Sequence, residues 1–144
     1  SAILAVKEFN KPYLIGAHVS EGTTLPSGEK ISNIKDIVDD KLLGIILACV
    51  SPENFELNIN ELISLKLPFG FKLNGFKTTK IKEGYTSAFL KQKSNPNQFL
   101  GKRQDLTPEK ISEIAKKFKN AGATILGGCC ETSPSHILAI SKVK

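Results

Sequence analysis

The sequence predicts an α/β protein built on a parallel β-sheet, and three observations lead to this fold class. Short apolar runs of strand length alternate along the chain with segments whose apolar residues recur at helical spacing. Ser-Pro or Thr-Pro opens three of the helical segments, as is typical of a helix N-terminus. Polar segments that contain Gly and Pro separate the runs. Because parallel strands need a long crossover connection, usually a helix, this alternation favours a parallel sheet.

The first part of the chain is predicted to form two helix–strand pairs. Residues 2–9 (AILAVKEF) have the pattern of the end of an amphipathic helix, which the following Asn-Lys-Pro breaks. Residues 13–19 (YLIGAHV) are a mostly apolar run of strand length, and a polar loop follows at residues 20–29. Residues 31–40 carry apolar side chains at helical spacing. Residues 42–49 (LLGIILAC) are a continuous apolar run, as expected of a strand that is buried on both faces.

The second part repeats the pattern with clearer helix boundaries. A helix begins at residues 51–53 (Ser-Pro-Glu), with Ser as the N-cap, Pro at the first helical position and Glu near the positive end. A third strand is predicted at residues 68–73 (PFGFKL), and a long polar connection follows at residues 74–106. Residues 107–109 (Thr-Pro-Glu) open another helix with the same chemistry, and Gly122 stands where its C-terminal cap belongs.

The chain ends with a fourth predicted strand at residues 123–128 and a last helix that begins at Ser133 and Pro134. Its length suits one domain over residues 1–144. Four strand–helix units make either a small open sheet or half of an eight-stranded barrel, which typically needs about 250 residues. Four barrel strands alone would leave two unpaired edges and an uncovered inner face. A half-barrel should therefore associate with a second copy or with the missing half.

Composition argues against two classes of partner and favours one compartment. The net charge is +6, but the lysines are scattered and Arg103 is the sole arginine, so we do not expect nucleic-acid binding. No apolar run approaches about 18 residues, so no membrane span is expected. Three cysteines are an odd number, which does not suit a secreted disulfide framework. A reducing compartment fits better, and we expect a cytoplasmic protein.

The cysteines are the most informative residues of the chain. Cys49, Cys129 and Cys130 all fall at the carboxyl ends of predicted strands, where parallel α/β proteins bind ligands. A helix N-terminus follows each position and favours thiolate over thiol. Three thiolates with an open fourth position are the pattern of a catalytic zinc site. The two glycines before the pair, Gly127 and Gly128, permit the backbone to leave strand geometry so that both sulfurs reach one ion. The alternatives are buried small side chains or a redox dithiol, although the usual Cys-x-x-Cys spacing is absent.

Three further residues on the same predicted edge are candidates for binding a substrate. His18 ends the first predicted strand, Asn74 follows the third, and Gly128 precedes the paired cysteines. His18 is equally consistent with a polar residue at the start of a loop, and Asn74 with an Asn-Gly turn. Gly128 would let a substrate approach the backbone closely. His136 lies one turn into the last helix and is expected to pack or cap there.

Several stretches of the sequence resemble the homocysteine S-methyltransferases, a zinc-dependent family. Residues 127–137 (GGCCETSPSHI) look like the C-terminal signature of that family, and the paired cysteines are the most specific part. Residues 44–53 (GIILACVSPE) are similar to an upstream element in which a strand that ends in Cys leads into a helix. Residues 105–130 resemble the last helix and strand almost throughout. Ala48, Leu73 and Glu131 differ from the residues that the family usually has.

The resemblance implies a specific fold and activity. The family fold is a (β/α)8 TIM barrel, and this chain matches its C-terminal half, strands five to eight, without the N-terminal half and its contacts to homocysteine. The implied zinc ligands are Cys49, Cys129 and Cys130. The implied enzyme is a methyltransferase that moves a methyl group from a small-molecule donor to the thiol of homocysteine, in methionine biosynthesis. The donor stays open among S-methylmethionine, S-adenosylmethionine, betaine and methylfolate. The alternative is a non-catalytic zinc- or thiol-binding half-barrel that needs a partner half to be active.

Overall fold

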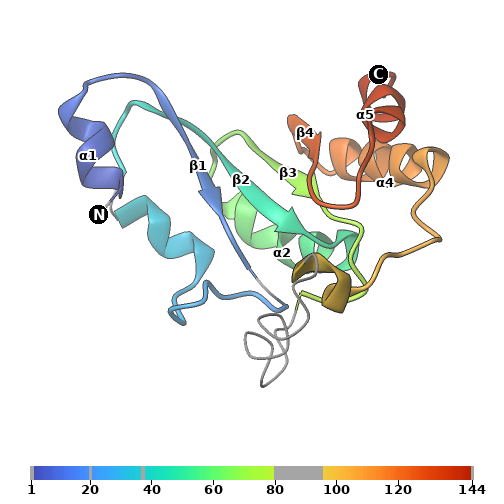
Figure 1. The fold of residues 1–144 in the computed structure, drawn as a ribbon. Helices are drawn as coiled ribbons and strands as arrows, with labels where there is room; N and C mark the ends of the chain where they lie inside the picture. The colour runs from blue at the N-terminus through green and yellow to red at the C-terminus, as the bar shows by residue number, and fades with distance from the viewer. Residues whose placement is uncertain (1, 20, 37, 80–95, 144) are drawn as a thin grey trace.

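The computed structural model describes residues 2–19, 21–36, 38–79 and 96–143, and its centre is a mixed α/β arrangement around one parallel sheet (Figure 1). The sheet has four strands in the order β1-β2-β3-β4, and all neighbouring strands are parallel. The predicted parallel sheet is therefore confirmed, and its strands follow one another in chain order. The strands are β1 (Tyr13–Ala17), β2 (Leu42–Val50), β3 (Phe69–Leu73) and β4 (Ile125–Gly128).

The helices that open with Ser-Pro or Thr-Pro begin where the sequence predicts. The described helical elements are α1 (Ala2–Glu8), η1 (Ile31–Asp36), α2 (Pro52–Ser64), η2 (Pro96–Leu100), α4 (Pro108–Asn120) and α5 (Pro134–Ser141). The Oγ of Ser51 accepts a hydrogen bond from the N–H of Asn54 at 3.2 Å, and Thr107 caps α4 in the same way. Gly122 follows the end of α4 with a φ of 108°, a value that glycine adopts at low cost. Among the described helices, none combines the length and the apolar character that crossing a membrane requires.

The predicted helix at residues 31–40 is replaced by the short 3-10 helix η1. Ile31 and Ile34 are both buried, and residues three apart lie in line on a 3-10 helix, so this form satisfies the apolar spacing. The carbonyl of Asp39 accepts from the N–H of Leu42 at 3.2 Å, and its carboxylate accepts from the N–H of Lys41 at 3.0 Å. This local turn competes with helical hydrogen bonds and ends the helix early.

The core lies on the face of the sheet that α2 and α4 cover. Phe55 of α2, Phe71 of β3 and Phe118 of α4 meet there, with ring centroids 4.8–5.7 Å apart. All three side chains are fully buried, so the cluster ties two helices to the centre of the sheet. On the opposite face, the side chains of Leu14 and Lys72 stay exposed to solvent. The two faces of the sheet therefore differ in how far they are covered.

The connection between β3 and α4 lies partly outside the described residues. Its described part contains η2 and an antiparallel bridge between Phe76 and Lys102. This connection and the loops after β1 and β2 start from the carboxyl end of the sheet, which is the lower end of the arrows in Figure 1. The carboxyl end is therefore the edge where segments that are distant in the sequence come together.

Candidate metal centre

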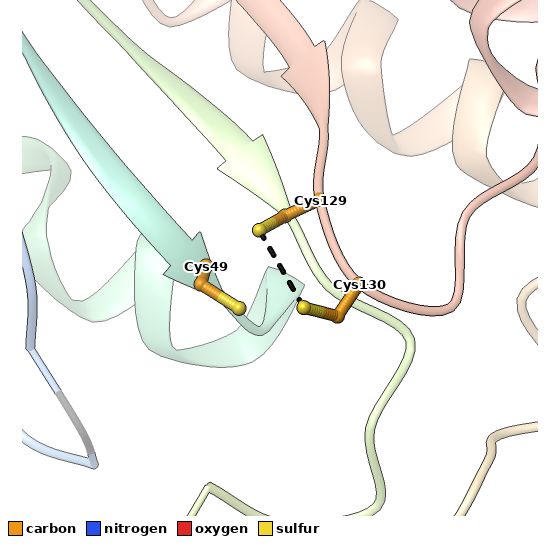
Figure 2. Close-up of side chains that lie close together, drawn as sticks. All are labelled: Cys49, Cys129 and Cys130. Atoms are coloured by element: carbon orange, nitrogen blue, oxygen red, sulfur yellow. Dashed lines mark hydrogen bonds between the residues drawn. The ribbon is translucent and has the colours of Figure 1, made fainter. Parts of the chain in front are cut away.

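Three cysteine side chains meet at the carboxyl end of the sheet (Figure 2). The Sγ atoms of Cys49, Cys129 and Cys130 all lie within 4.8 Å of one another. The two sulfurs of the adjacent pair are 3.9 Å apart. Cys49 belongs to β2 and the other two follow β4, so the sulfurs meet across the end of β3, which lies between these strands. The structure thus brings together the three cysteines that the sequence placed on one edge.

Cys49 reaches the cluster because β2 contains a bulge at this residue. In the pairing of β2 with β3, Ala48 lies opposite Lys72 and Val50 lies opposite Leu73, which leaves Cys49 as an extra residue. Cys49 has a φ of 54°, a left-handed backbone conformation that residues other than glycine rarely adopt. A bulge bends the strand and re-aims the extra side chain, here toward the cysteine pair. Strain of this kind is commonly found at functional sites.

Cys129 and Cys130 lie in a tight turn after β4. The N–H of Cys129 donates to the carbonyl of Leu73 at 2.7 Å, and the hydroxyl of Thr132 donates back to the carbonyl of Cys129 at 2.6 Å. A Cβ at Gly128 would lie 2.5 Å from the Oγ1 of Thr132. The glycine is therefore required by packing, since any larger residue would push Thr132 away from the cysteine backbone. The expectation that Gly127 and Gly128 let the backbone leave strand geometry is wrong, because both residues belong to β4.

The environment of the thiols favours their neutral form when no metal is bound, whereas the sequence predicted that the helix N-termini would favour thiolate; burial outweighs that effect. Burial, together with the nearby thiols of Cys129 and Cys130, raises the pKa of Cys49 to about 12. Burial also raises the pKa of Cys130. Both groups are thus protonated at neutral pH, and a bound cation would have to displace their protons.

The donor set fits a zinc ion. Tetrahedral coordination with Zn–S bonds of ~2.3 Å implies sulfurs about 3.8 Å apart. The observed separation of 3.9 Å in the adjacent pair matches this value. All three sulfurs lie within 4.8 Å of one another, so only small movements would bring the remaining separations to it. Three soft sulfur donors select zinc over hard cations such as Mg²⁺ or Ca²⁺. The residues present could therefore hold zinc and leave one coordination position for another ligand.

The remaining predicted site residues lie at the same edge, and their roles in substrate binding stay predictions. His18 is exposed, and its Nδ1 lies 3.2 Å from the carbonyl oxygen of Ala48, next to Cys49. Asn74 is fully buried; its Nδ2 donates to the carbonyl of Cys49 at 2.5 Å. Gly128 is the last residue of β4. His136 caps α5 as expected, because its Nδ1 accepts from the N–H of Ser133 at 3.0 Å.

Arg103 links the loop after β3 to the start of α2, a role that the sequence alone does not predict. Its side chain is 20% exposed and binds the carboxylates of Glu53 and Asp105 at 2.8 and 2.7 Å. Its backbone N–H donates to the carbonyl of Gly75 at 2.8 Å. A cavity of about 410 Å³ lies beside it, with Phe76 and Glu53 in its wall. The only signal in the sequence is that Arg103 is the sole arginine, which does not indicate a partner.

Comparisons with known proteins give a consistent result. A family model described as homocysteine S-methyltransferase matches residues 1–143. Homocysteine S-methyltransferase 1 of Zea mays is 53% identical over 30 residues, which cover 21% of this chain and 9% of the relative. Homocysteine S-methyltransferase 3 of Arabidopsis thaliana is 22% identical over 144 residues, which cover 98% of this chain and 38% of the relative. The chain thus spans less than half the length of these curated relatives.

Proposed function

The chain belongs to the homocysteine S-methyltransferase family, and we propose that it is the zinc-binding part of an enzyme that methylates the thiol of homocysteine to give methionine. The methyl group would come from a small-molecule donor. Cys49, Cys129 and Cys130 would hold the zinc ion. The observation that carries the proposal is the meeting of these three sulfurs within 4.8 Å at the carboxyl end of the sheet.

The chemistry of the site explains why a thiol substrate suits it. Bound zinc would lower the pKa of a thiol that binds to it, so that the thiolate nucleophile is available at neutral pH. The protein's own part is to present three sulfur donors from two strand ends and to leave the fourth direction open. The bulge at Cys49 and the turn after β4 hold these donors in place. The site therefore needs no further side chain as a metal ligand.

The strand order supports a half-barrel as the architecture of this part. Doubly wound sheets reverse their strand order at the ligand-binding point. In this sheet the order β1-β2-β3-β4 follows the chain without reversal, as it does in a (β/α)8 barrel. We assign these strands to positions five to eight of such a barrel.

A non-catalytic zinc- or thiol-binding half-barrel is the second candidate. Leu14 on the end strand β1 is 48% exposed. This exposed apolar side chain at the edge of the sheet favours a unit that becomes active only with a partner, either an N-terminal half or a second copy. The metal site would be the same in both cases, and only the ability to turn over substrate would differ.

The zinc content of the purified chain tests the metal site. We expect one zinc per chain in the unmodified protein and a large loss in Cys129→Ser, measured by elemental analysis. Ser135→Ala is the matched control, because Ser135 is exposed in the same stretch of chain and should leave the zinc content unchanged. An unchanged zinc content in Cys129→Ser would contradict the proposed site.

Methyl transfer then separates the two candidates. The chain is incubated with homocysteine and each donor, and methionine is measured with and without an N-terminal half from a family member. Methionine formed by the chain alone supports an enzyme that is complete in this part. Methionine formed only with the added half supports the partner-dependent module. No methionine in either mixture would overturn the methyl-transfer proposal while leaving the zinc measurement valid.

A further inference from the structure

The segment 73–75 makes hydrogen bonds to the backbone of all three cysteines. The carbonyl of Leu73 accepts from the N–H of Cys129 at 2.7 Å, and the N–H of Gly75 donates to the carbonyl of Cys130 at 2.9 Å. Between them, the side-chain Nδ2 of Asn74 donates to the carbonyl of Cys49 at 2.5 Å. This segment begins with the last residue of β3, across whose end the sulfurs meet in Figure 2. The two cysteine-bearing loops are therefore linked through one short piece of chain.

The bond from Asn74 acts at the strained point of the site. Cys49 is the extra residue of a bulge, so the regular β2–β3 hydrogen bonds leave its carbonyl without a ladder partner. Asn74 supplies that partner, and its backbone N–H also donates to the carbonyl of Val50 at 2.9 Å. These two bonds hold the carbonyls of Cys49 and of the next residue, and so they hold the left-handed backbone of Cys49 in the conformation that directs the sulfur toward the pair.

The contact uses both polar atoms of the Asn74 amide. The Oδ1 of Asn74 accepts from the N–H of Phe76 at 3.1 Å while the Nδ2 donates to Cys49. A side chain at this position must accept and donate at the same time, which an ionised Asp cannot do because it only accepts. Asn74 is fully buried, so water cannot readily replace either bond.

We propose that Asn74 is a positioning residue for the metal centre, which fixes the backbone of Cys49 so that its sulfur joins those of Cys129 and Cys130. This inference rests on the proposed zinc site and extends it. Asn74 would act by holding the metal ligand Cys49 in place, whereas the sequence suggested that Asn74 contacts the substrate. The two roles lead to different measurable effects, because a residue that positions a ligand changes metal affinity and a residue that contacts only the substrate changes KM.

The test compares Asn74→Asp with the matched control Asn58→Asp. Asn58 is another fully buried asparagine, and its Nδ2 donates to the carbonyls of Gly22 and Asn54, not to a cysteine. Each variant keeps the shape of the side chain and removes an amide donor. Zinc affinity is measured by competition with a chelator, and the Co²⁺ form is examined by its thiolate-to-cobalt and d–d absorption. We expect about 10–100-fold weaker zinc binding and an altered cobalt spectrum only for Asn74→Asp.

The outcomes distinguish this inference from the function on which it rests. Wild-type zinc affinity and an unchanged cobalt spectrum in Asn74→Asp would overturn the positioning role, and so would a higher KM for homocysteine at unchanged zinc affinity. Failure of the unmodified chain to bind zinc would instead overturn the proposed function. The smaller, uncharged Asn74→Ser gives the same test if a buried carboxylate prevents folding, and we expect the same loss of affinity.

Discussion

Replacing Gly70 by alanine should damage both the sheet and the cysteine cluster. Gly70 is the second residue of β3 and pairs with Ile125 of β4. A Cβ at this position would overlap the carbonyl oxygen of Ile125 and would lie 2.5 Å from its carbonyl carbon. Non-bonded carbons normally stay ~3.5–4.0 Å apart, so β4 would have to move away by about 1 Å. Since the obstacle is backbone, no side-chain rotation can relieve it.

The cost of this movement follows from the bonds that hold β4. The N–H of Thr124 donates to the carbonyl of Phe69 at 2.8 Å, and the N–H of Cys129 donates to that of Leu73 at 2.7 Å. A shift of about 1 Å takes both beyond the ~3.2 Å limit of a normal N–H···O bond. Two bonds at about 1 kcal/mol each, with about 1–3 kcal/mol of overpacking strain, give a destabilisation of about 3–5 kcal/mol.

Urea unfolding of the metal-free chain and zinc titration of the folded protein check this prediction. Gly70→Ala should unfold at lower urea and bind zinc more weakly, because β4 carries the adjacent cysteines. Gly16→Ala is the matched control, since a Cβ there would meet only the Cβ of Ala48, at 3.9 Å. It should be no less stable than the unmodified chain and gain up to about 1 kcal/mol. If Gly70→Ala is as stable as the unmodified chain and binds zinc with the same affinity, the reasoning is refuted.

Three further predictions concern the core, a helix cap and pH. Phe118→Ala removes a fully buried ring and should cost about 3–5 kcal/mol in urea unfolding. His136→Ala removes the side-chain acceptor for the N–H of Ser133 and should cost about 1 kcal/mol in thermal unfolding. The metal-free, reduced chain should lose stability as pH rises from 9 to 12, because the unfolded chain ionises Cys49 near the ordinary thiol pKa of 9.0 while the folded chain raises that pKa to about 12. This loss should be smaller in Cys49→Ser, and an identical pH profile would contradict the assignment.

The parts of the fold that depend on local signals could be predicted from the sequence. Apolar runs indicated the four strands, and the Ser-Pro and Thr-Pro openings indicated the starts of α2, α4 and α5, because capping involves residues that are neighbours in the chain. The helix at residues 31–40 was predicted from spacing alone. The structure has η1 there, because a turn at Asp39 competes with the helix through short-range bonds that spacing does not reveal.

The candidate site was predictable in its composition but not in its construction. The carboxyl ends of parallel strands share one edge of the sheet, so the meeting of three cysteines could be expected. The bulge could not, because it depends on which residue of β3 lies opposite Val50. The bond from Asn74 to Cys49 joins residues 25 apart in the chain, and no local pattern marks it. The sequence shows which residues can bind a metal, whereas the pairing of strands decides how they are aimed.

The bulge at Cys49 resolves a conflict between the core and the site. In a regular strand side chains alternate between the two faces, so with Leu47 in the core, Cys49 would also enter the core and Val50 would face outward. The extra residue reverses this: Val50 is fully buried and Cys49 is only partly buried. A strained backbone conformation costs about 1–3 kcal/mol, while burying a Val side chain stabilises by about 1.5–3 kcal/mol. These two magnitudes are similar, so burial of Val50 largely offsets the strain before any metal binds. The fold itself thus holds the sulfur of Cys49 toward its two partners, and the bond from Asn74 adds to this preference.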